Sequence, residues 1–216
     1  MTSSYITLAR PGQDEIVILK SRFLGYAAPC TSEEEALSFL QGLREAHRAA
    51  THHCYAYIIG ENAGITRYSD NGEPAGTAGL PMLEVLKSRN LVNCCAVVVR
   101  YFGGTLLGTG GLVRAYTQSA VNAVDHAGLA RMEWTSDLLC EVPYPVWDRL
   151  RYAAERLPVR LMDAEYGSAV TFHMLVREKD RDRCVDALME ASGRKMETLP
   201  DSEGFQAWEV AEQPSS

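Results

Sequence analysis

The residues with the most recognisable chemistry lie in one glycine-rich segment, AVVVRYFGGTLLGTGGLVRAY, which runs from Ala96 to Tyr116. The apolar run Ala96–Val99 predicts a buried strand, the glycines after it predict a tight turn, and a helical pattern starts at Leu112. Such a succession can present unpaired backbone N–H groups to an anion, with the positive end of a helix dipole behind them. The segment therefore predicts a site for a phosphate or a nucleic-acid backbone.

The glycine spacing differs from that of the nucleotide-binding loops. Gly103-x4-Gly108 resembles the start of a Walker A loop, but Thr109-Gly110 stands where Lys-Ser/Thr should follow, and Gly111 breaks the dinucleotide-binding pattern. An alternative is that the glycines only let the strand turn tightly into a helix packed against the sheet. The candidates for anion or nucleic-acid binding in this segment are Arg100, Tyr101, Phe102, Gly103, Gly104, Gly108, Gly110, Gly111 and Arg114.

Arg100, Tyr101 and Phe102 follow the predicted strand, where a guanidinium could pair with phosphate and a ring could stack on a base. Alternation along the strand sends Arg100 and Phe102 to one face and Tyr101 to the other. The alternative for Arg100 is an internal ion pair with Asp70 or Glu73, because a guanidinium suits carboxylates as well as phosphates. The sequence leaves both alternatives open.

A second glycine-rich entry into a helix lies at Ser69–Gly79, before a short helix predicted near Pro81–Arg89. Two such helix starts at one cleft would bind an anion better than one. Asp70 and Glu73 could act there as acid or base, or they could simply cap the helix. The candidates from this segment and from the strand before it are Asp70, Glu73, Gly76, Thr77, Gly79 and His53.

His53 and Cys54 could be a base beside a thiol, and His52, His53, Asp70 and Glu73 could form an acid–base or metal cluster. Neighbouring residues on a strand point to opposite faces, however, so Cys54 is most simply a core thiol. The six cysteines include no C-x-x-C pair, which is typical of buried free thiols in a reducing compartment. We therefore expect no catalytic residue, no metal site and no cofactor.

Composition and charge limit the class of protein. The chain has 216 residues, of which 46% are hydrophobic, as expected for two compact domains. It contains no apolar run of about 20 residues and no basic-then-apolar start, so we expect no membrane span and a cytoplasmic protein. Residues 1–134 carry 11 Lys and Arg against 12 Asp and Glu, whereas residues 135–216 carry 10 against 16. The first half is therefore the better candidate for an anionic ligand.

Hydrophobic periodicity predicts the elements that position these residues. In the first half it predicts strands at Tyr5–Ala9, Glu15–Lys20 and Arg22–Ala28, a helix from Ser32 with a capping box to Glu35, a hairpin of Cys54–Ile59 with Ile65–Tyr68, and a helix at Leu112–Ala127. In the second half it predicts strands at Ser136–Val142, Val159–Glu165, Ser168–Val176 and Phe205–Val210, with helices at Pro145–Leu157 and Asp180–Ala191. The second half thus has the β-α-β-β-α-β order of ferredoxin-like domains, and we expect the boundary near residues 133–136.

Three blocks together resemble the YigZ/IMPACT family: VVVRYFGGTLLGTGGLVRAY, SDNGEPAGTAGLPMLEVL at residues 69–86 and ATHHCYAYIIG at residues 50–60. The resemblance implies an α+β protein. Residues 1–134 would form an Impact N-terminal-type domain with the fold of ribosomal protein S5 domain 2, with helices on one face of a mixed sheet. Residues 135–212 would form a ferredoxin-like domain similar to a domain of elongation factor G, and residues 213–216 a frayed tail.

The resemblance also implies a link to translation. Eukaryotic IMPACT relatives act in regulating translation, and bacterial members have been suggested to bind nucleic acid or the translation machinery. We therefore expect a non-enzymatic binding protein whose partner is RNA, the ribosome or a translation regulator. Two alternatives stay open: a small-molecule phosphate-binding enzyme that uses the same loops, and an adaptor that binds proteins through its acidic C-terminal domain.

Overall fold

The chain forms two compact units in the computed structural model, which describes residues 4–211 and the side chains of residues 4–208. One unit contains the chain up to Met132 together with the residues from Ala207 onward, and the other is Glu133–Gln206. The frayed tail expected at residues 213–216 lies outside the described residues. Within the described part of the chain, no helix has the length and apolar character needed to span a membrane.

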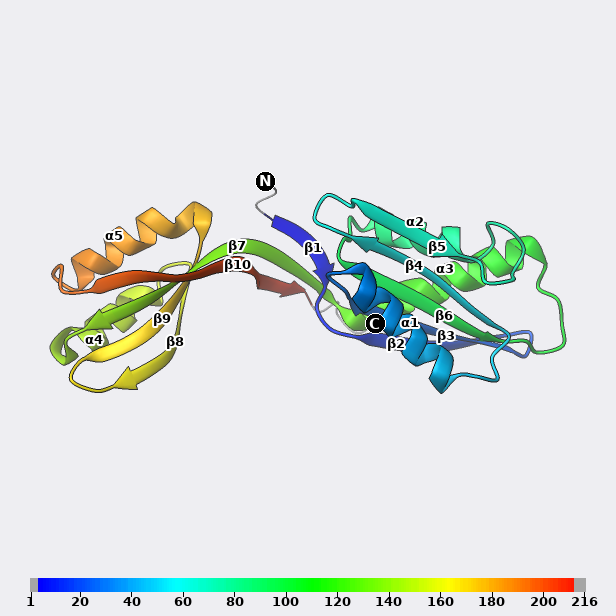
Figure 1. Cartoon of the computed structure of the whole chain (residues 1–216), viewed down its shortest axis with the longest axis horizontal. Helices are drawn as coiled ribbons and strands as arrows, with labels where there is room; N and C mark the ends of the chain where they lie inside the picture. The colour runs from blue at the N-terminus through cyan, green and yellow to red at the C-terminus, as the bar shows by residue number, and fades with distance from the viewer. Residues whose placement is uncertain (1–3, 212–216) are drawn as a thin grey trace. The chain divides into compact units, whose positions relative to one another are not determined.

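The first unit is built on an antiparallel sheet with the strand order β2-β3-β6-β4-β5 (Figure 1). The predicted hairpin is confirmed, because β4 and β5 pair antiparallel. The strands of this unit are β1 (Ser4–Leu8), β2 (Gly12–Ile18), β3 (Ser21–Pro29), β4 (His52–Ile59), β5 (Ile65–Ser69) and β6 (Cys94–Tyr101).

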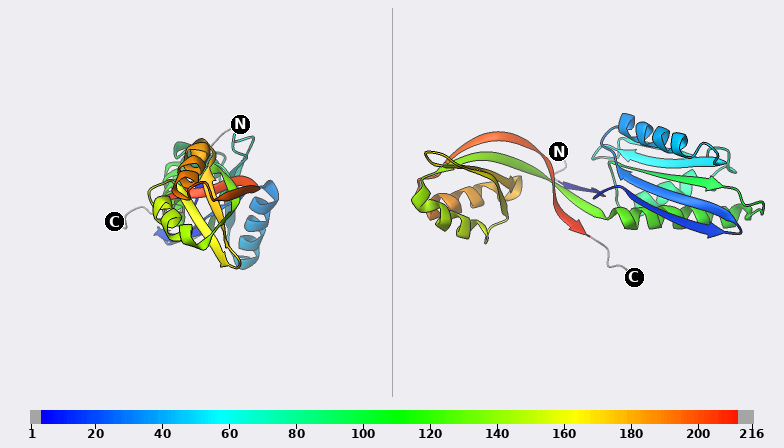
Figure 2. Two further views of the ribbon diagram at one scale, coloured as in Figure 1. Left: turned by 90° about the vertical axis from the view of Figure 1, so that its left-hand side faces the viewer. Right: turned by 90° about the horizontal axis from the view of Figure 1, so that it is seen from below.

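Helices cover both faces of this sheet. The helix α1 (Glu33–Ala46) packs on one face, and α2 (Gly79–Ser88) and α3 (Gly108–Ala127) pack on the other (Figure 2). The expectation of a mixed sheet with helices on one face was therefore wrong on both points. The physical reason lies in β6, whose residues from Cys94 to Arg100 are all buried, so that the strand needs apolar cover on both sides.

Two helix starts show what local sequence determines. The predicted start of α1 is confirmed, since the Glu35 N–H donates to Ser32 Oγ at 3.1 Å. The Glu35 carboxylate accepts from the backbone N–H of Thr31 at 2.7 Å. The helix α3 begins at Gly108 and not at Leu112. The sequence Gly-Thr-Gly-Gly is thus the first turn of the helix and not the turn before it.

The second unit contains the elements β-α-β-β-α-β in chain order. Its strands are arranged β7-β9-β8, and both β10 and β1 pair with β7. The helices α4 and α5 pack on one face of this sheet over a separate core. The elements are β7 (Leu129–Val142), α4 (Tyr144–Ala154), β8 (Val159–Tyr166), β9 (Val170–Arg177), a short 3-10 turn (Glu178–Asp180), α5 (Arg181–Ala191) and β10 (Glu197–Ala211).

Two strands of this unit are longer than predicted. β7 begins at Leu129 instead of Ser136, and β10 begins at Glu197 instead of Phe205. Pro200 and Gly204 interrupt the β10 sequence with residues that usually mark the end of a strand. Pairing with the long strand β7 extends β10 through them.

Candidate functional site

Arg100 lies inside the first unit and is only 4% exposed. Its Nη1 atom donates to Glu73 Oε1 at 2.6 Å, and its Nη2 atom donates to Ser21 Oγ at 3.3 Å. The guanidinium also lies over the rings of Phe23 and Phe102, at 5.2 and 5.4 Å from their centroids. Of the two alternatives for Arg100, the structure shows the internal ion pair. Its charge is neutralised within the protein.

Glu73 is the centre of a buried polar cluster. Besides Arg100, the Tyr116 hydroxyl donates to Glu73 Oε1 at 2.7 Å, and His52 Nε2 lies 3.8 Å from the same oxygen. Nearby, Cys54 Sγ donates to the backbone carbonyl of Asp70. Burial raises the pKa of the Cys54 thiol to about 12 and raises the pKa of Tyr116 well above its usual range. Both groups therefore stay protonated, and neither is activated as a nucleophile.

Asp70 caps the helix α2. Its carboxylate accepts hydrogen bonds from the backbone N–H groups of Gly76 at 2.8 Å, Ala78 at 3.0 Å and Gly79 at 2.8 Å. The Thr77 hydroxyl donates to the carbonyl of Pro74. The donors that the sequence offered to an external anion at this helix start are therefore bonded to a carboxylate of the protein itself.

The two faces of the sheet separate the other candidates as strand alternation predicts. Cys54 faces α2 and α3, whereas the charges of Arg44 and His47 in and after α1 act on His53. Burial and Arg44 together lower the pKa of His53, which keeps the imidazole neutral. Tyr101 also faces α1, where its hydroxyl lies 3.0 Å from His47 Nδ1. The structure thus separates His53 from Cys54, and Tyr101 from Arg100.

Two candidate glycines are required by packing. A Cβ atom at Gly103 would lie 2.1 Å from the carbonyl carbon of Lys20, and one at Gly79 would lie 2.7 Å from that of Ser69. Other glycines face open space: Gly104 and Gly108 have φ of +83° and +68°, with no atom within 4 Å of the place where a Cβ would stand. At Gly103 and Gly79 the close-packing alternative holds, whereas the exposed glycines shape a surface loop.

That loop and the start of α3 are exposed. Phe102 is 46% exposed and Leu106 is 84% exposed, and Gly108, Thr109 and Gly110 are exposed as well. The N-cap residue Leu107 provides no capping side chain, and the first turn of α3 contains no acidic residue. The helix dipole and the N–H groups, which form no side-chain hydrogen bond within the described part of the chain, therefore give this helix start a positive character.

Two further groups lie next to this loop. The guanidinium of Arg114 lies 3.7 Å from the position of a Gly110 Cβ, and among the described side chains it forms no ion pair. The β2–β3 turn packs against Gly103 and holds Leu19 and Lys20 at positive φ, 46° and 65°. We call the exposed set the loop surface, and it consists of Leu19, Lys20, Phe102, residues 104–106, residues 108–110 and Arg114.

Sequence reasoning missed the contribution of the β2–β3 turn. Turns of this kind usually carry Asn or Gly, and Leu19-Lys20 gives no such signal. Leu19 is nevertheless 56% exposed in a backbone conformation that is costly for a branched apolar residue. Strain of this kind accumulates at functional sites.

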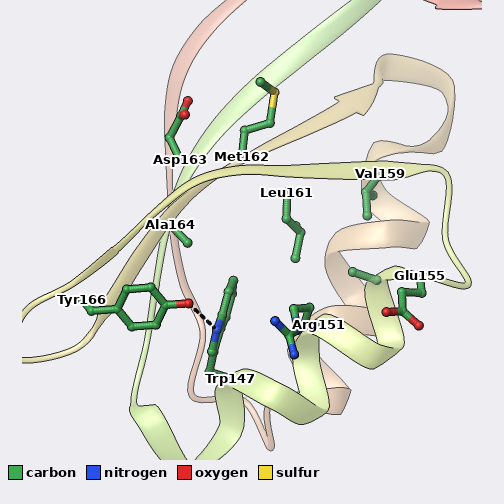
Figure 3. A pocket seen from close by; sticks show the side chains of 10 residues that line it. Trp147, Arg151, Glu155, Val159, Leu161, Met162, Asp163, Ala164 and Tyr166 are labelled. Carbon is green, nitrogen blue, oxygen red and sulfur yellow. Dashed lines mark hydrogen bonds between the residues drawn. The ribbon is translucent and has the colours of Figure 1, made fainter.

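The second unit contains a cavity of about 370 Å³ between α4 and β8 (Figure 3). Trp147 and Tyr166 form its aromatic side, and the Trp147 indole N–H donates to the Tyr166 hydroxyl at 3.3 Å. Arg151 of α4 and Glu155, which follows the helix, also line it. Sequence reasoning did not predict this cavity, because the packing of α4 against β8 decides which side chains line it.

Comparisons with known proteins agree with this architecture. Residues 19–124 match the family model described as the Impact N-terminal domain. The chain is 40% identical to IMPACT family member YvyE of Bacillus subtilis over 90% of each protein. It is 48% identical to IMPACT family member YigZ of Escherichia coli over 46% of this chain and 50% of that protein. A crystal structure of a hypothetical protein aligns with a TM-score of 0.61 at 29% identity and covers 94% of this chain and 99% of its own.

The likeness to YvyE spans both units, and the family model covers the elements that build the loop surface and the Glu73 cluster. The three sequence blocks that resembled the family all fall within the matched region. The chain therefore belongs to the YigZ/IMPACT family.

Proposed function

We propose that this protein is a non-enzymatic binding protein of the cytoplasm that acts in translation or its regulation by docking the loop surface onto the ribosome. Family membership supports the link to translation. The observation that carries the proposal is the exposed, uncapped start of α3 beside Phe102, Leu106 and Arg114. Positive backbone groups next to exposed apolar side chains suit a ribosomal surface of phosphates and protein side chains.

The groups weighed for catalysis support binding instead. Asp70 caps a helix, Glu73 neutralises Arg100, and Cys54 is buried with a raised pKa. Their hydrogen bonds hold the segment 69–79 and the exit of β6 in place. Their role in the proposal is to shape and stiffen the first unit below the loop surface.

We also propose the finer fold assignment. The first domain, residues 1–134, would have the fold of ribosomal protein S5 domain 2, and residues 135–212 would form the ferredoxin-like domain similar to a domain of elongation factor G. The β-α-β-β-α-β order of the second unit and its strand arrangement β8-β9-β7-β10 support the ferredoxin-like assignment. A fold alone does not show a function, so the proposed function rests on the surface.

Co-sedimentation with ribosomes at two salt concentrations tests the proposal, with purified RNA as a separate arm. Thr109→Asp places a carboxylate in the first turn of α3, where its negative charge compensates the positive end of the helix dipole. We expect this variant to bind at least several-fold more weakly than the wild type while α3 becomes slightly more stable, by roughly 0.3–1 kcal/mol. Thr109→Asn has the same shape without the charge and should keep most of the binding.

The other outcomes discriminate between partners. Leu106→Ser could weaken ribosome binding while higher salt leaves that binding unchanged. This outcome would support a contact with ribosomal protein. Binding to purified RNA as tight as to ribosomes would identify RNA as the partner, and the salt slope would then report its phosphate contacts. Failure of the wild type to bind ribosomes at low salt would overturn the ribosome proposal.

A further inference from the structure

We infer that the second unit carries a binding site for a divalent transition-metal ion, formed by Asp137, His173 and Asp201. These residues come from three strands, β7, β9 and β10. One ligand atom from each, two carboxylate oxygens and an imidazole nitrogen, can be chosen so that all three lie within 4.8 Å of one another. The chain positions are far apart, so only the strand pairing brings the three residues together.

The distances suit a metal ion. His173 Nδ1 lies 2.9 Å from Asp137 Oδ1. Two ligands at about 2.1 Å from a common ion lie roughly 3.0–3.4 Å apart in octahedral or tetrahedral geometry. The distance between the imidazole nitrogen and the carboxylate oxygen is therefore close to that between two neighbouring ligands of one ion. Asp201 would supply a third ligand atom from β10.

The site lies on the face of the sheet that α4 and α5 leave uncovered. Residues such as Leu138, Phe172 and Met174 pack against the helices, whereas Asp137 and His173 alternate with them and point the other way. The side chains of His173 and Asp137 are 30% and 22% exposed. A hydrated ion can reach them, and water can complete the coordination.

A third carboxylate adds negative charge. The pairing of β8 with β9 shifts between Met162 and Glu165, and Asp163 has φ of +54°. This bulge leaves the side chains of Asp163 and Met162 on the same side of β8 (Figure 3). Met162 is the cross-strand partner of His173.

The ligand set selects the class of ion. One imidazole and two or three carboxylates suit Zn²⁺ or Mn²⁺ better than soft ions that need thiolates. An ion bound here would join β7, β9 and β10 and would stabilise the folded second unit by mass action. It would also keep open positions for water or for a ligand atom of a partner. This inference does not depend on the proposed function.

Calorimetric titration of the metal-free full-length protein with Zn²⁺ tests the site. We expect one ion per chain, and binding at least tenfold weaker in each of Asp137→Asn, His173→Ala and Asp201→Asn. Asp148→Asn is the matched control, since that side chain is 90% exposed on α4 and paired only with Arg151, and it should bind as the wild type does. Zn²⁺ should raise the midpoint temperature of thermal unfolding of the wild type and should leave that of His173→Ala unchanged.

Folding of each variant is checked by circular dichroism, and the Asp→Asn changes keep the side-chain shape. Absence of Zn²⁺ and Mn²⁺ binding by the wild type at millimolar metal would overturn the inference. So would wild-type affinity in all three site variants, because the ion would then be bound by other groups.

Discussion

At the residue scale, the fate of Arg100 changes how the glycine-rich segment is understood. A guanidinium at the end of a buried strand, followed by two aromatic residues, has the composition of a phosphate and base contact. The structure neutralises it with Glu73 and places it between the rings of Phe23 and Phe102. The positive character of the loop surface then comes from backbone N–H groups, Lys20 and Arg114 instead.

Arg100→Ala tests the structural role of this pair. Removal of the guanidinium leaves the buried Glu73 carboxylate without its charged partner, which costs about 3–5 kcal/mol. Urea unfolding measures this decrease in the free energy of unfolding. Arg100→Met combined with Glu73→Gln removes both charges and should recover a large part of it.

The exposed ion pair of Arg22 with Glu15 is the control for this measurement. Its side chains are 50% and 40% exposed, so Arg22→Ala should cost much less stability than Arg100→Ala. Equal losses for the Arg22 and Arg100 variants would contradict the view that Arg100 is structural. They would also return Arg100 to the candidates for ligand binding.

Cys54 provides a pH-dependent prediction. With a pKa of about 12, roughly one thiol in 10⁴ is a thiolate at pH 8, whereas a free cysteine of pKa about 8.5 is substantially ionised. Because the thiolate is the reactive form and Cys54 is fully buried, alkylation of Cys54 in the folded protein should be far slower at pH 8 than that of an exposed thiol, and its rate should rise with pH. Mass spectrometry of Cys54 peptides after timed alkylation measures the rate, and fast labelling with a plateau near neutral pH would indicate an activated cysteine.

At the scale of elements, the β2–β3 hairpin and the start of α3 carry features that stability alone does not favour. The helix begins without a capping side chain, and the hairpin turns through Leu19 and Lys20 at positive φ. Gly103 packs against the backbone of Lys20, so the turn and the loop after β6 are one rigid end of the first unit. Both features fit an end whose role is contact with a partner.

Replacing the turn by Leu19→Asn with Lys20→Gly removes this strain. Asn-Gly is the preferred pair for a two-residue hairpin loop, and we expect a gain of about 1–2 kcal/mol in the free energy of unfolding. The same change removes an exposed apolar side chain and a cation from the loop surface, so ribosome binding should fall. Chemical denaturation and co-sedimentation of one preparation give both values.

Ala63→Gly is the matched control for the turn. Ala63 also has positive φ, 53°, but it lies in the β4–β5 connection, and the strand register puts that connection at the other end of the sheet. This variant should gain some stability and should bind as the wild type does. A turn variant that is more stable and binds unchanged would remove Leu19 and Lys20 from the proposed surface.

At the scale of the whole molecule, the chain has separate hydrophobic cores in its two units. The first unit has one core cluster on each face of its sheet. The second unit packs α4 and α5 on one face of its own sheet. Separate cores allow the units to lose structure separately. Most of the acidic excess of residues 135–216 belongs to the second unit.

Leu150→Ala tests this separation. Leu150 is fully buried in α4, and its truncation should destabilise the second unit by about 2–5 kcal/mol. Hydrogen exchange followed by mass spectrometry should show lost protection in peptides of residues 133–206 and unchanged protection in β3, β4 and β6. Leu86→Ala in α2 is the matched change in the first unit and should give the reverse pattern. Equal loss in both units after either change would show a single cooperative structure.

Local signals predicted most of the elements correctly. The capping box at Ser32, the hairpin of β4 with β5 and the β-α-β-β-α-β order of the second half follow from patterns a few residues long. The start of α3 was misplaced because glycine is a poor helix former and hides a first turn. The layer arrangement was wrong, although the continuous apolar run in β6 already indicated a strand covered on both faces.

The sequence by itself determined the family, the order of the elements and the opposite orientation of His53 and Cys54, because motifs and strand alternation are local properties. Only the tertiary structure decided the partners of the charged groups. Arg100 pairs with Glu73, Asp70 accepts hydrogen bonds at the start of α2, and His173 pairs with Asp137. In each case the two partners are distant in the chain. Residue types give the capacity for a charge contact, whereas strand register and packing decide which of several suitable partners lies within reach.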